Sequence, residues 1–146
     1  MFSGKAIHTI DDKGRLVLPS NFRRALEGDT RVVLAIHEDQ CLMLHRQTDF
    51  NAEAEKREAE LIDTFEGREM FRYFMSRVAE VDLDKAGRVL IGEDFRRQAN
   101  IEPGSEVVIV GMRRYAEIWN RPAFEAQEAR SAATFFSRQQ GEVAPT

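Results

Sequence analysis

The chain has 146 residues, of which 42% are hydrophobic and 32% are charged, a composition typical of a folded globular protein. This length allows one ordinary core, or two small modules that share one. The formal net charge of −4 counts against a nucleic-acid binder when the chain is taken as a whole. Residues 1–24, however, hold five basic against two acidic side chains, whereas residues 51–69 hold seven acidic against three basic ones. The two regions therefore carry opposite electrostatic fields.

The apolar segments are short, and the longest of them, residues 32–36 and 107–110, have the length of β-strands. Since no segment reaches the length of a signal peptide or a membrane helix, we expect neither export nor membrane contact. The single cysteine, Cys41, lies in an apolar stretch. It predicts a buried free thiol in a reducing cytoplasm, because one cysteine cannot form an intrachain disulfide.

An internal repeat organises the chain. The sequence Ile-Asp-Asp-Lys-Gly-Arg-Leu-Val-Leu of residues 10–18 aligns without a gap with Leu-Asp-Lys-Ala-Gly-Arg-Val-Leu-Ile of residues 83–91. At the same offset, Phe-Arg-Arg recurs at residues 22–24 and 95–97, and two apolar runs match after a small length change. The chain therefore contains a duplicated unit of roughly 45 residues, which predicts a pseudo-twofold molecule.

Each unit is predicted to be mostly β. In the first unit we expect strands at residues 6–10 and 15–18 around a turn at 11–14, then a short helix after Pro19, and strands at 32–36 and 41–44. The second unit repeats this order, with its short helix at 93–99 and strands at 107–110 and 117–119. Asp11 and Gly14 shape the first turn and Asp84 and Gly87 the second, because aspartate accepts backbone N–H bonds and glycine adopts a positive φ.

Helices are expected after each unit. One is predicted from a cap at Thr48 to an end near Gly67, and it is followed by an apolar stripe that belongs either in the core or at a subunit contact: Met70, Phe71, Phe74 and Met75. Another helix begins near Pro122 and runs to about residue 138, before a loose tail. The predicted divisions are a first module at 5–50, a helical connector at 51–78, a second module at 79–124, and a C-terminal helix and tail at 125–146.

The motif set resembles the MraZ family over nearly the whole chain. The residues that carry the resemblance are Met1-Phe2-x-Gly4, Asp11-x-Lys13-Gly14-Arg15-Leu16-x-x-Pro19 and Asp84-x-x-Gly87-Arg88. The resemblance implies an α+β, mainly β fold, in which two tandem AbrB-like swapped-hairpin modules form one pseudo-twofold β-barrel-like core with helices after each module. Two departures occur in the second copy, where Gly92 replaces Pro19 and Ala86 replaces Lys13.

The resemblance also implies a function. Members of this family are similar to repressors that bind short repeated boxes in double-stranded DNA as ring-shaped homo-oligomers, upstream of the division and cell-wall gene cluster that includes their own promoter. This implies a cytoplasmic protein associated with the nucleoid. Nothing in the resemblance implies a small-molecule substrate, a membrane or a cofactor.

The candidate DNA-binding residues lie at the two hairpin turns: Lys13, Arg15, Lys85 and Arg88. Arginine offers a planar fork that reads guanine or clamps phosphate, and lysine a mobile charge. An alternative is that Arg15 and Arg88 only hold their hairpins through ion pairs with Asp11 and Asp84. The four arginines of the repeated Phe-Arg-Arg segments (Arg23, Arg24, Arg96 and Arg97) are either flanking phosphate contacts or, as we favour, solvated helix faces.

Other functional classes are weaker. No phosphate loop, zinc knuckle or nucleophile–base pair is present, so we expect no catalysis and no cofactor. The spacing of His37, Cys41 and His45 suggests a metal site, but positions i, i+4 and i+8 along strands span roughly 26 Å at about 3.3 Å per residue, so we expect none. An AbrB-like antitoxin with a toxin partner and a purely structural ring protein remain as alternatives.

Overall fold

The computed structural model describes residues 1–139 and shows the same succession of elements twice. The first repeat contains β1 (Lys5–Thr9), β2 (Arg15–Val17), α1 (Ser20–Ala25), β3 (Arg31–Ile36) and β4 (Leu42–Arg46). The second contains β5 (Val78–Asp82), β6 (Arg88–Leu90), α4 (Glu93–Gln98), β7 (Glu106–Gly111) and β8 (Tyr115–Asn120). Three longer helices complete the described part: α2 (Gln47–Leu61), α3 (Phe65–Ser76) and α5 (Arg121–Gln139). The α+β, mainly β class is therefore confirmed.

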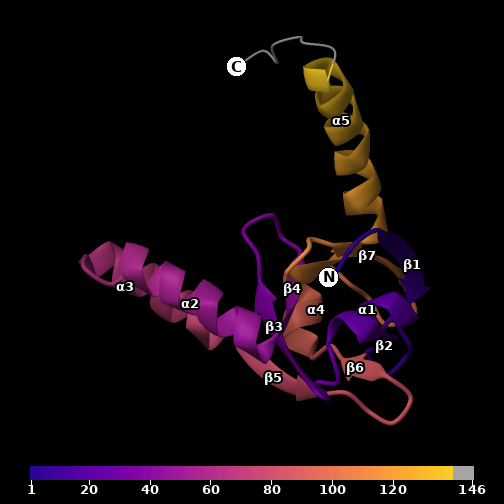
Figure 1. Ribbon diagram of the computed structural model, residues 1–146, viewed down its shortest axis with the longest axis horizontal. Coiled ribbons are helices and arrows are strands. Elements are labelled where there is room, and N and C mark those ends of the chain that lie inside the picture. The colour runs from indigo at the N-terminus through magenta and orange to yellow at the C-terminus, as the bar shows by residue number, and fades with distance from the viewer. Residues whose placement is uncertain (140–146) are drawn as a thin grey trace.

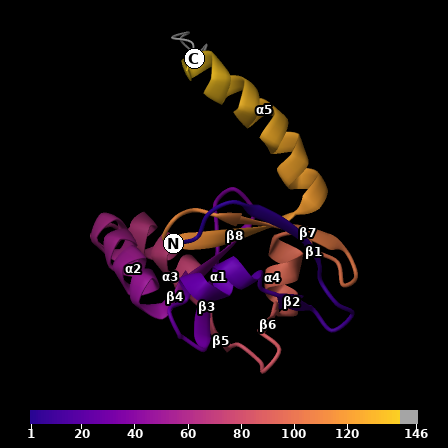
Figure 2. The same ribbon diagram turned by 45° about the vertical axis from the view of Figure 1, so that its right-hand side comes forward.

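The two repeats exchange strands (Figures 1 and 2). A six-stranded antiparallel sheet has the order β1-β7-β8-β4-β3-β5, so the first strand of each repeat pairs with the third strand of the other. The second strands, β2 and β6, pair separately as a two-stranded ribbon. The contacts β4 with β8 and β2 with β6 each join equivalent elements. A pseudo-twofold axis therefore passes between both of these pairs, as the sequence repeat predicts.

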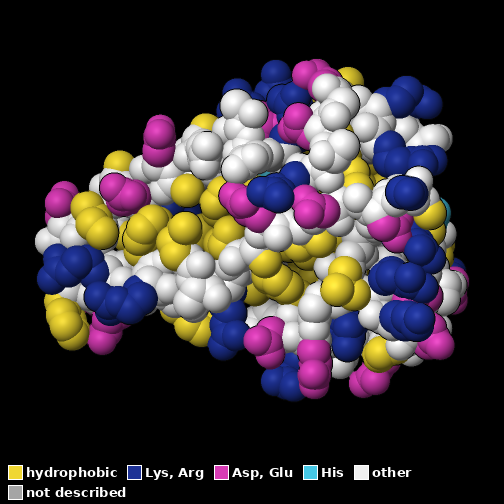
Figure 3. Space-filling view, turned by 90° about the horizontal axis from the view of Figure 1, so that it is seen from below, with side chains coloured by type: hydrophobic (Ala, Val, Ile, Leu, Met, Phe, Trp, Pro, Cys, Tyr) yellow, Lys and Arg dark blue, Asp and Glu magenta, His cyan; other side chains and the backbone are white. Residues whose placement is uncertain are grey.

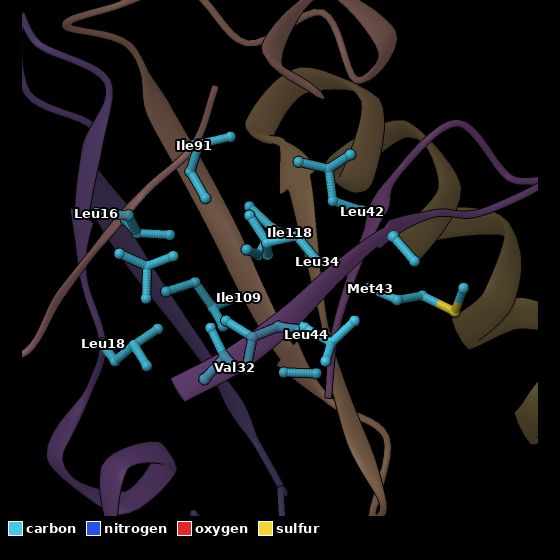
Figure 4. Packing of buried hydrophobic residues seen from close by; sticks show 14 of the residues in the cluster. Leu16, Leu18, Val32, Leu34, Leu42, Met43, Leu44, Ile91, Ile109 and Ile118 are labelled. Atoms are coloured by element: carbon cyan, nitrogen blue, oxygen red, sulfur yellow. The ribbon is translucent and has the colours of Figure 1, made fainter. Parts of the chain in front are cut away.

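One hydrophobic core lies between the sheet and the ribbon. Residues from both repeats fill it, and Figure 4 shows Leu16, Leu34, Ile91, Ile109 and Ile118 converging on the same space. All five have 0% of their surface exposed. At about 1.5–3 kcal/mol per buried aliphatic side chain, this shared core is a large stabilising contribution that neither repeat could supply alone.

The strand-to-helix corner is the same in both repeats despite the change from Pro19 to Gly92. Pro19 has φ −56° and ψ 149°, and Gly92 has φ −61° and ψ 158°. The Pro19 carbonyl accepts from the N–H of Arg23, and the Gly92 carbonyl accepts from the N–H of Arg96, both at 3.0 Å. Proline fixes this φ through its ring, whereas glycine adopts it because the following helix and the paired ribbon hold it there.

The helical connector differs from the prediction. A single helix ending near Gly67 is wrong, because α2 ends at Leu61 and Gly67 lies in the first turn of α3. Thr64 caps α3 by accepting from the Gly67 N–H at 2.9 Å, a bond that the apolar periodicity does not reveal. Thr48 is likewise inside the first turn of α2 rather than before it.

The helices α2 and α3 form an arm that projects from the β core (Figure 1). Of the predicted apolar stripe on α3, Phe74 is buried against the core, whereas Met70 and Met75 are exposed. On the other side of the molecule α5 also projects, and Phe135 and Phe136 are exposed along it. The predicted C-terminal helix is confirmed, and the rest of the predicted tail, residues 140–146, lies outside the described residues. Within residues 1–139, no helix has the length and apolar character needed to span a membrane.

Candidate functional site

The two Asp-x-x-Gly-Arg turns have the same geometry. In the first, Asp11 Oδ1 accepts from the backbone N–H groups of Lys13 and Arg15 at 2.9 and 2.8 Å, and the Asp11 carbonyl accepts from the Gly14 N–H at 3.1 Å. Gly14 has a φ of +82°, which a glycine adopts at little cost. One aspartate therefore organises the whole turn.

The second turn repeats these contacts with Ala86 in place of lysine. Asp84 Oδ1 accepts from the N–H groups of Ala86 and Arg88, each at 2.9 Å, and Gly87 has a φ of +75°. Lys85, one position earlier, is exposed, as Lys13 is in the first turn. Because only backbone groups of residue 86 take part, the substitution leaves the turn intact and moves its lysine by one position.

The arginine of each turn is held by the aspartate of the same turn. Arg15 Nε donates to Asp11 Oδ2 at 2.8 Å, and Arg88 Nε donates to Asp84 Oδ2 at 2.6 Å. The ion pairs of the alternative interpretation are thus present. They use only Nε, however, and in residues 1–139 no hydrogen bond involves the terminal Nη groups of either arginine. With about a third of each side chain exposed, both guanidinium groups are oriented and still accessible.

These contacts also keep the aspartates ionised. The pKa of Asp11 lies below its ordinary value, chiefly because its carboxylate accepts the backbone N–H of Arg15, and then because it accepts the Arg15 side chain. Asp84 has a lowered pKa for the same reasons with Arg88. Hydrogen bonds to the charged form favour that form, so each arginine keeps its anionic partner at neutral pH.

The outer face of the ribbon combines both arginines with two aliphatic side chains. Leu16 and Val89 are directly paired and face the core, whereas their neighbours along β2 and β6 alternate outward. Arg15 lies opposite Leu90 and Val17 lies opposite Arg88. Val17 is 41% exposed and Leu90 50% exposed. The result is a small face with two arginines and two aliphatic groups related by the pseudo-twofold axis.

A further pair of arginines joins the turns across the repeats. The guanidinium of Arg96 lies against Gly14 of the other repeat and donates from Nη1 to the Ile91 carbonyl at 2.8 Å. In the symmetric position, Arg23 packs on Gly87. Arg96 is therefore more than a solvated helix face, whereas Arg23 packs on Gly87 and is still exposed to solvent, as expected. A second reason for glycine emerges as well, because a Cβ at Gly14 would overlap Arg96 and one at Gly87 would crowd Arg23.

This close approach yields a prediction with a matched control. Gly14→Ala should destabilise the protein more than Gly4→Ala, although both positions have positive φ and each substitution costs about 1–2 kcal/mol for backbone strain. A Cβ at Gly4 meets nothing within 4 Å. A Cβ at Gly14 would lie 3.0 Å from the Ile91 carbonyl oxygen and displace the Arg96 guanidinium from its hydrogen bond to that carbonyl, a loss of about 0.5–1.5 kcal/mol. Chemical denaturation of both variants measures the difference, and equal losses would contradict the packing assigned to Arg96.

Basic side chains gather at the ribbon end of the molecule (Figure 3). The same view shows hydrophobic side chains along the arm formed by α2 and α3 at the opposite end. The acidic segment 51–69 lies within this arm, away from the ribbon. A protein with a net negative charge can in this way present a locally basic surface.

Sequence reasoning did not assign Val17 and Leu90 to this surface, and it named Arg23 and Arg96 without finding their partners. Val17 and Leu90 were detectable from the alternation of buried and exposed positions around Leu16 and Val89. The partners of Arg23 and Arg96 were not, because they are glycines more than 60 positions away in the sequence of the other repeat. Only the exchange of strands between repeats brings them together.

Comparison with known proteins places the chain. A family model described as "MraZ protein, putative antitoxin-like" matches residues 1–71 and again residues 74–143. The chain is 35% identical over 135 residues to proteins named "Transcriptional regulator MraZ" from Burkholderia cenocepacia (strain HI2424) and Burkholderia mallei (strain SAVP1), covering 91% of this chain and 92% of each relative. The resemblance carried by the two turn motifs is confirmed, and the chain belongs to the MraZ family.

Proposed function

We propose that this chain is a DNA-binding transcriptional regulator, rather than an enzyme, and that it binds double-stranded DNA through the outer face of the β2–β6 ribbon and its two turns. The observation that carries the proposal is the pair of oriented arginines, Arg15 and Arg88, whose Nη groups are free of intramolecular hydrogen bonds within residues 1–139. The name of the 35% identical relatives supports the regulatory role.

The shape and chemistry of the ribbon suit the major groove. That groove is about 12 Å wide and admits a two-stranded ribbon. Arginine forks read guanine edges or clamp phosphates, and the exposed Val17 and Leu90 are suited to contact thymine methyl groups. Lys13 and Lys85, at the ends of the ribbon, are then close to the flanking phosphates. Because the two halves are related by a pseudo-twofold axis, one ribbon presents similar chemistry to both strands of the duplex.

Asp11, Gly14, Asp84 and Gly87 act in this proposal by shaping the turns. The carboxylates of Asp11 and Asp84 hold the arginines in one orientation before DNA binds, which reduces the conformational entropy lost on binding. A direct contact of either carboxylate with DNA is disfavoured by repulsion from the phosphates.

A homo-oligomer, as a ring, completes the proposal. Four basic residues give one chain only modest affinity for DNA. Each phosphate that they neutralise adds only about −0.9 to the slope of log K against log salt concentration. Several ribbons facing repeated DNA boxes gain through effective concentration. Exposed apolar side chains on the projecting helices, including Phe65 and Met70 on α3 and Phe135 and Phe136 on α5, offer surfaces for contacts between copies. Light scattering of the purified chain tests this part, and a monomer at micromolar concentration would contradict it.

We place the protein in the cytoplasm on the nucleoid and propose repression of the division and cell-wall gene cluster, including its own promoter. The test is fluorescence anisotropy with duplex DNA from upstream of its own gene and a scrambled duplex of equal length. We expect tighter binding to the upstream duplex, with affinity falling as salt rises. Equal affinity for both duplexes, or no binding to either, would contradict sequence-specific regulation.

Affinity purification distinguishes the regulator from the antitoxin alternative, which the description of the family model also names. An antitoxin recovers a small toxin in stoichiometric amount when the tagged chain is purified from its own host. Recovery of that partner together with promoter binding would favour the antitoxin, whereas promoter binding by the chain alone favours the regulator.

A further inference from the structure

Three potential metal ligands meet at the tip of the hairpin between β3 and β4. The sequence argument that His37 and Cys41 are spread along strands is wrong, because a tight turn brings them together: the His37 N–H donates to the Cys41 carbonyl at 3.1 Å, and the Gln40 N–H donates to the His37 carbonyl at 3.0 Å. Glu117 joins them from β8 of the second repeat, and the ligand atoms of these three residues lie within 4.8 Å of one another. His45, the other residue of the spacing pattern, is not part of the cluster.

In the described part of the chain, Glu117 is a buried carboxylate with a single hydrogen-bond donor, on one of its two oxygens. Only 7% of its surface is exposed. Its Oε1 accepts from Trp119 Nε1 at 3.0 Å, but its Oε2 is 3.9 Å from His37 Nε2, too far for a hydrogen bond. Burying a charge is costly unless it is paired, and one neutral indole donor offsets only part of that cost. A cation beside Oε2 would add to the stabilisation of this carboxylate.

The surroundings of Cys41 are those of a cation site rather than of a reactive thiol. The residue is fully buried, its ligand atom lies within 4.8 Å of that of Glu117, and the acidic Glu38 and Asp39 precede it in the hairpin. The same negative charges that disfavour a bare thiolate attract a divalent cation, which in turn stabilises the thiolate as a ligand.

His37 has carboxylates in place to support ligation. Its Nδ1 accepts from the Asp39 N–H at 2.9 Å, so the ring proton of the neutral form lies on Nε2. For Nε2 to bind a metal, that proton moves to Nδ1, which then gives up the hydrogen bond from the Asp39 N–H and can donate toward the carboxylates of Asp39 and Glu38, 3.5 and 3.9 Å away. A carboxylate that holds the second ring nitrogen is the usual support of a metal-bound histidine.

We propose that His37 Nε2, Cys41 Sγ and Glu117 Oε2 bind a divalent transition-metal ion of the Zn²⁺ type, with water as the fourth ligand. Nitrogen, thiolate and carboxylate donors together suit Zn²⁺. Bond lengths of about 2.0–2.3 Å place tetrahedral ligands roughly 3.3–3.7 Å apart, so the side chains close by about 1 Å on binding. An open cavity lined by Asp39 and Trp119, which are sequence neighbours of the proposed ligands, lies between the hairpin tip and α5.

The ion would link the two repeats away from the ribbon. His37 and Cys41 belong to the first repeat and Glu117 to the second, on the strand that leads directly into α5. The bound ion stabilises the folded chain in proportion to its concentration. This inference does not depend on DNA binding.

The test is titration of the full chain, reduced, stripped of metal and without a polyhistidine tag, with Co²⁺ under anaerobic conditions. We expect one Co²⁺ per chain, a thiolate-to-cobalt charge-transfer band, displacement by Zn²⁺, and an increase in Tm with Zn²⁺. Cys41→Ser should abolish the band, and His37→Gln and Glu117→Gln should weaken Zn²⁺ binding at least about tenfold in competition with a chromophoric chelator.

His8→Gln is the matched control, because His8 lies on β1 outside the cluster. It should leave Co²⁺ binding unchanged. His37→Gln alters a side chain at the hairpin tip, and circular dichroism shows whether each variant is folded. Absence of stoichiometric binding to the wild-type chain would overturn the proposal. So would equal binding by folded His37→Gln, or a cobalt spectrum that is unchanged in Cys41→Ser.

Discussion

The Arg15→Ala, Arg88→Ala double variant is expected to bind the upstream duplex about 100-fold more weakly than the wild-type chain. A well-placed arginine contact with a base edge contributes about 1–3 kcal/mol, and about 1.4 kcal/mol corresponds to a factor of ten. Two such contacts, one from each turn and each contributing about 1.4 kcal/mol, therefore give a factor of about 100. Anisotropy at fixed salt measures the loss.

The single variants should be similar to each other. Arg15 and Arg88 occupy equivalent positions in the ribbon, have nearly equal exposure and make the same bond to their own aspartates. Each single variant should therefore lose about tenfold in affinity. The fold should survive, because exposed ion pairs contribute only about 0–1 kcal/mol to stability.

Two controls test whether the loss of DNA affinity depends on the position of the arginines and on the shape of the guanidinium group. Arg72→Ala removes an exposed arginine from α3, in the arm at the other end of the molecule, and should leave DNA affinity unchanged. Arg15→Lys with Arg88→Lys keeps both charges but removes the planar forks, so it should retain salt-dependent binding while losing the preference for the upstream duplex. If the double alanine variant binds like the wild-type chain, the arginines serve only to hold their turns.

Lowering the pH from 8 to 5 is expected to cost the wild-type chain about 2 kcal/mol of folding stability through His45 alone. Only 3% of this residue is exposed. Its ring stacks on Tyr115 at 4.8 Å between centroids and meets the edge of Phe50 at 5.6 Å, and neither ring nitrogen has a hydrogen-bond partner within residues 1–139. Burial therefore lowers the pKa of His45 from 6.5 to about 4.

The direction of this pH effect follows from how readily His45 takes up a proton in the unfolded and in the folded chain. The unfolded chain takes up a proton on His45 below pH 6.5, whereas the folded chain resists protonation down to about pH 4. Stability is therefore complete above pH 6.5 and is lost progressively as the pH falls toward 4. The nearby carboxylates of Glu53 and Asp49 moderate the effect by favouring the charged form.

His45→Phe should remove this part of the pH dependence. An aromatic ring is retained between Tyr115 and Phe50, and two buried nitrogen atoms without partners are lost, so stability at pH 8 should be preserved or increased. Urea denaturation at pH 8, 6.5 and 5 gives the comparison, with His8→Gln as the control that keeps the wild-type slope. If the free energy of unfolding of His45→Phe falls with pH as steeply as that of the wild-type chain, other groups cause the acid sensitivity.

Much of the fold was predictable because it depends on local patterns that occur twice. The aligned segments at residues 10–18 and 83–91 fix both turns, and the alternation around Leu16 and Val89 gives the ribbon its buried and exposed faces. The free thiol of Cys41 was correctly predicted to be buried. These features need only neighbouring residues and the requirement that apolar side chains leave water.

The rest depends on contacts between distant segments. The boundary between α2 and α3 is set by the Thr64 cap and by the close approach of Gly67 to the Leu61 carbonyl, which apolar spacing does not show. Arg23 and Arg96 acquire their roles only when the repeats exchange strands. His37 and Cys41 come together through a turn, and their third neighbour, Glu117, is supplied by the other repeat. A single sequence contains no direct signal for such partners.

Hydrogen exchange measured by mass spectrometry, with and without the upstream duplex, tests the central claim most directly. If one surface built from both repeats binds DNA, exchange of the amides in residues 11–18 and 84–91 should slow together when duplex is added. Protection caused by contacts between copies of the chain is present in both samples and therefore cancels when the two exchange rates are compared. Slower exchange in only one of the two turns, or only in α2, α3 or α5, would contradict a shared ribbon surface.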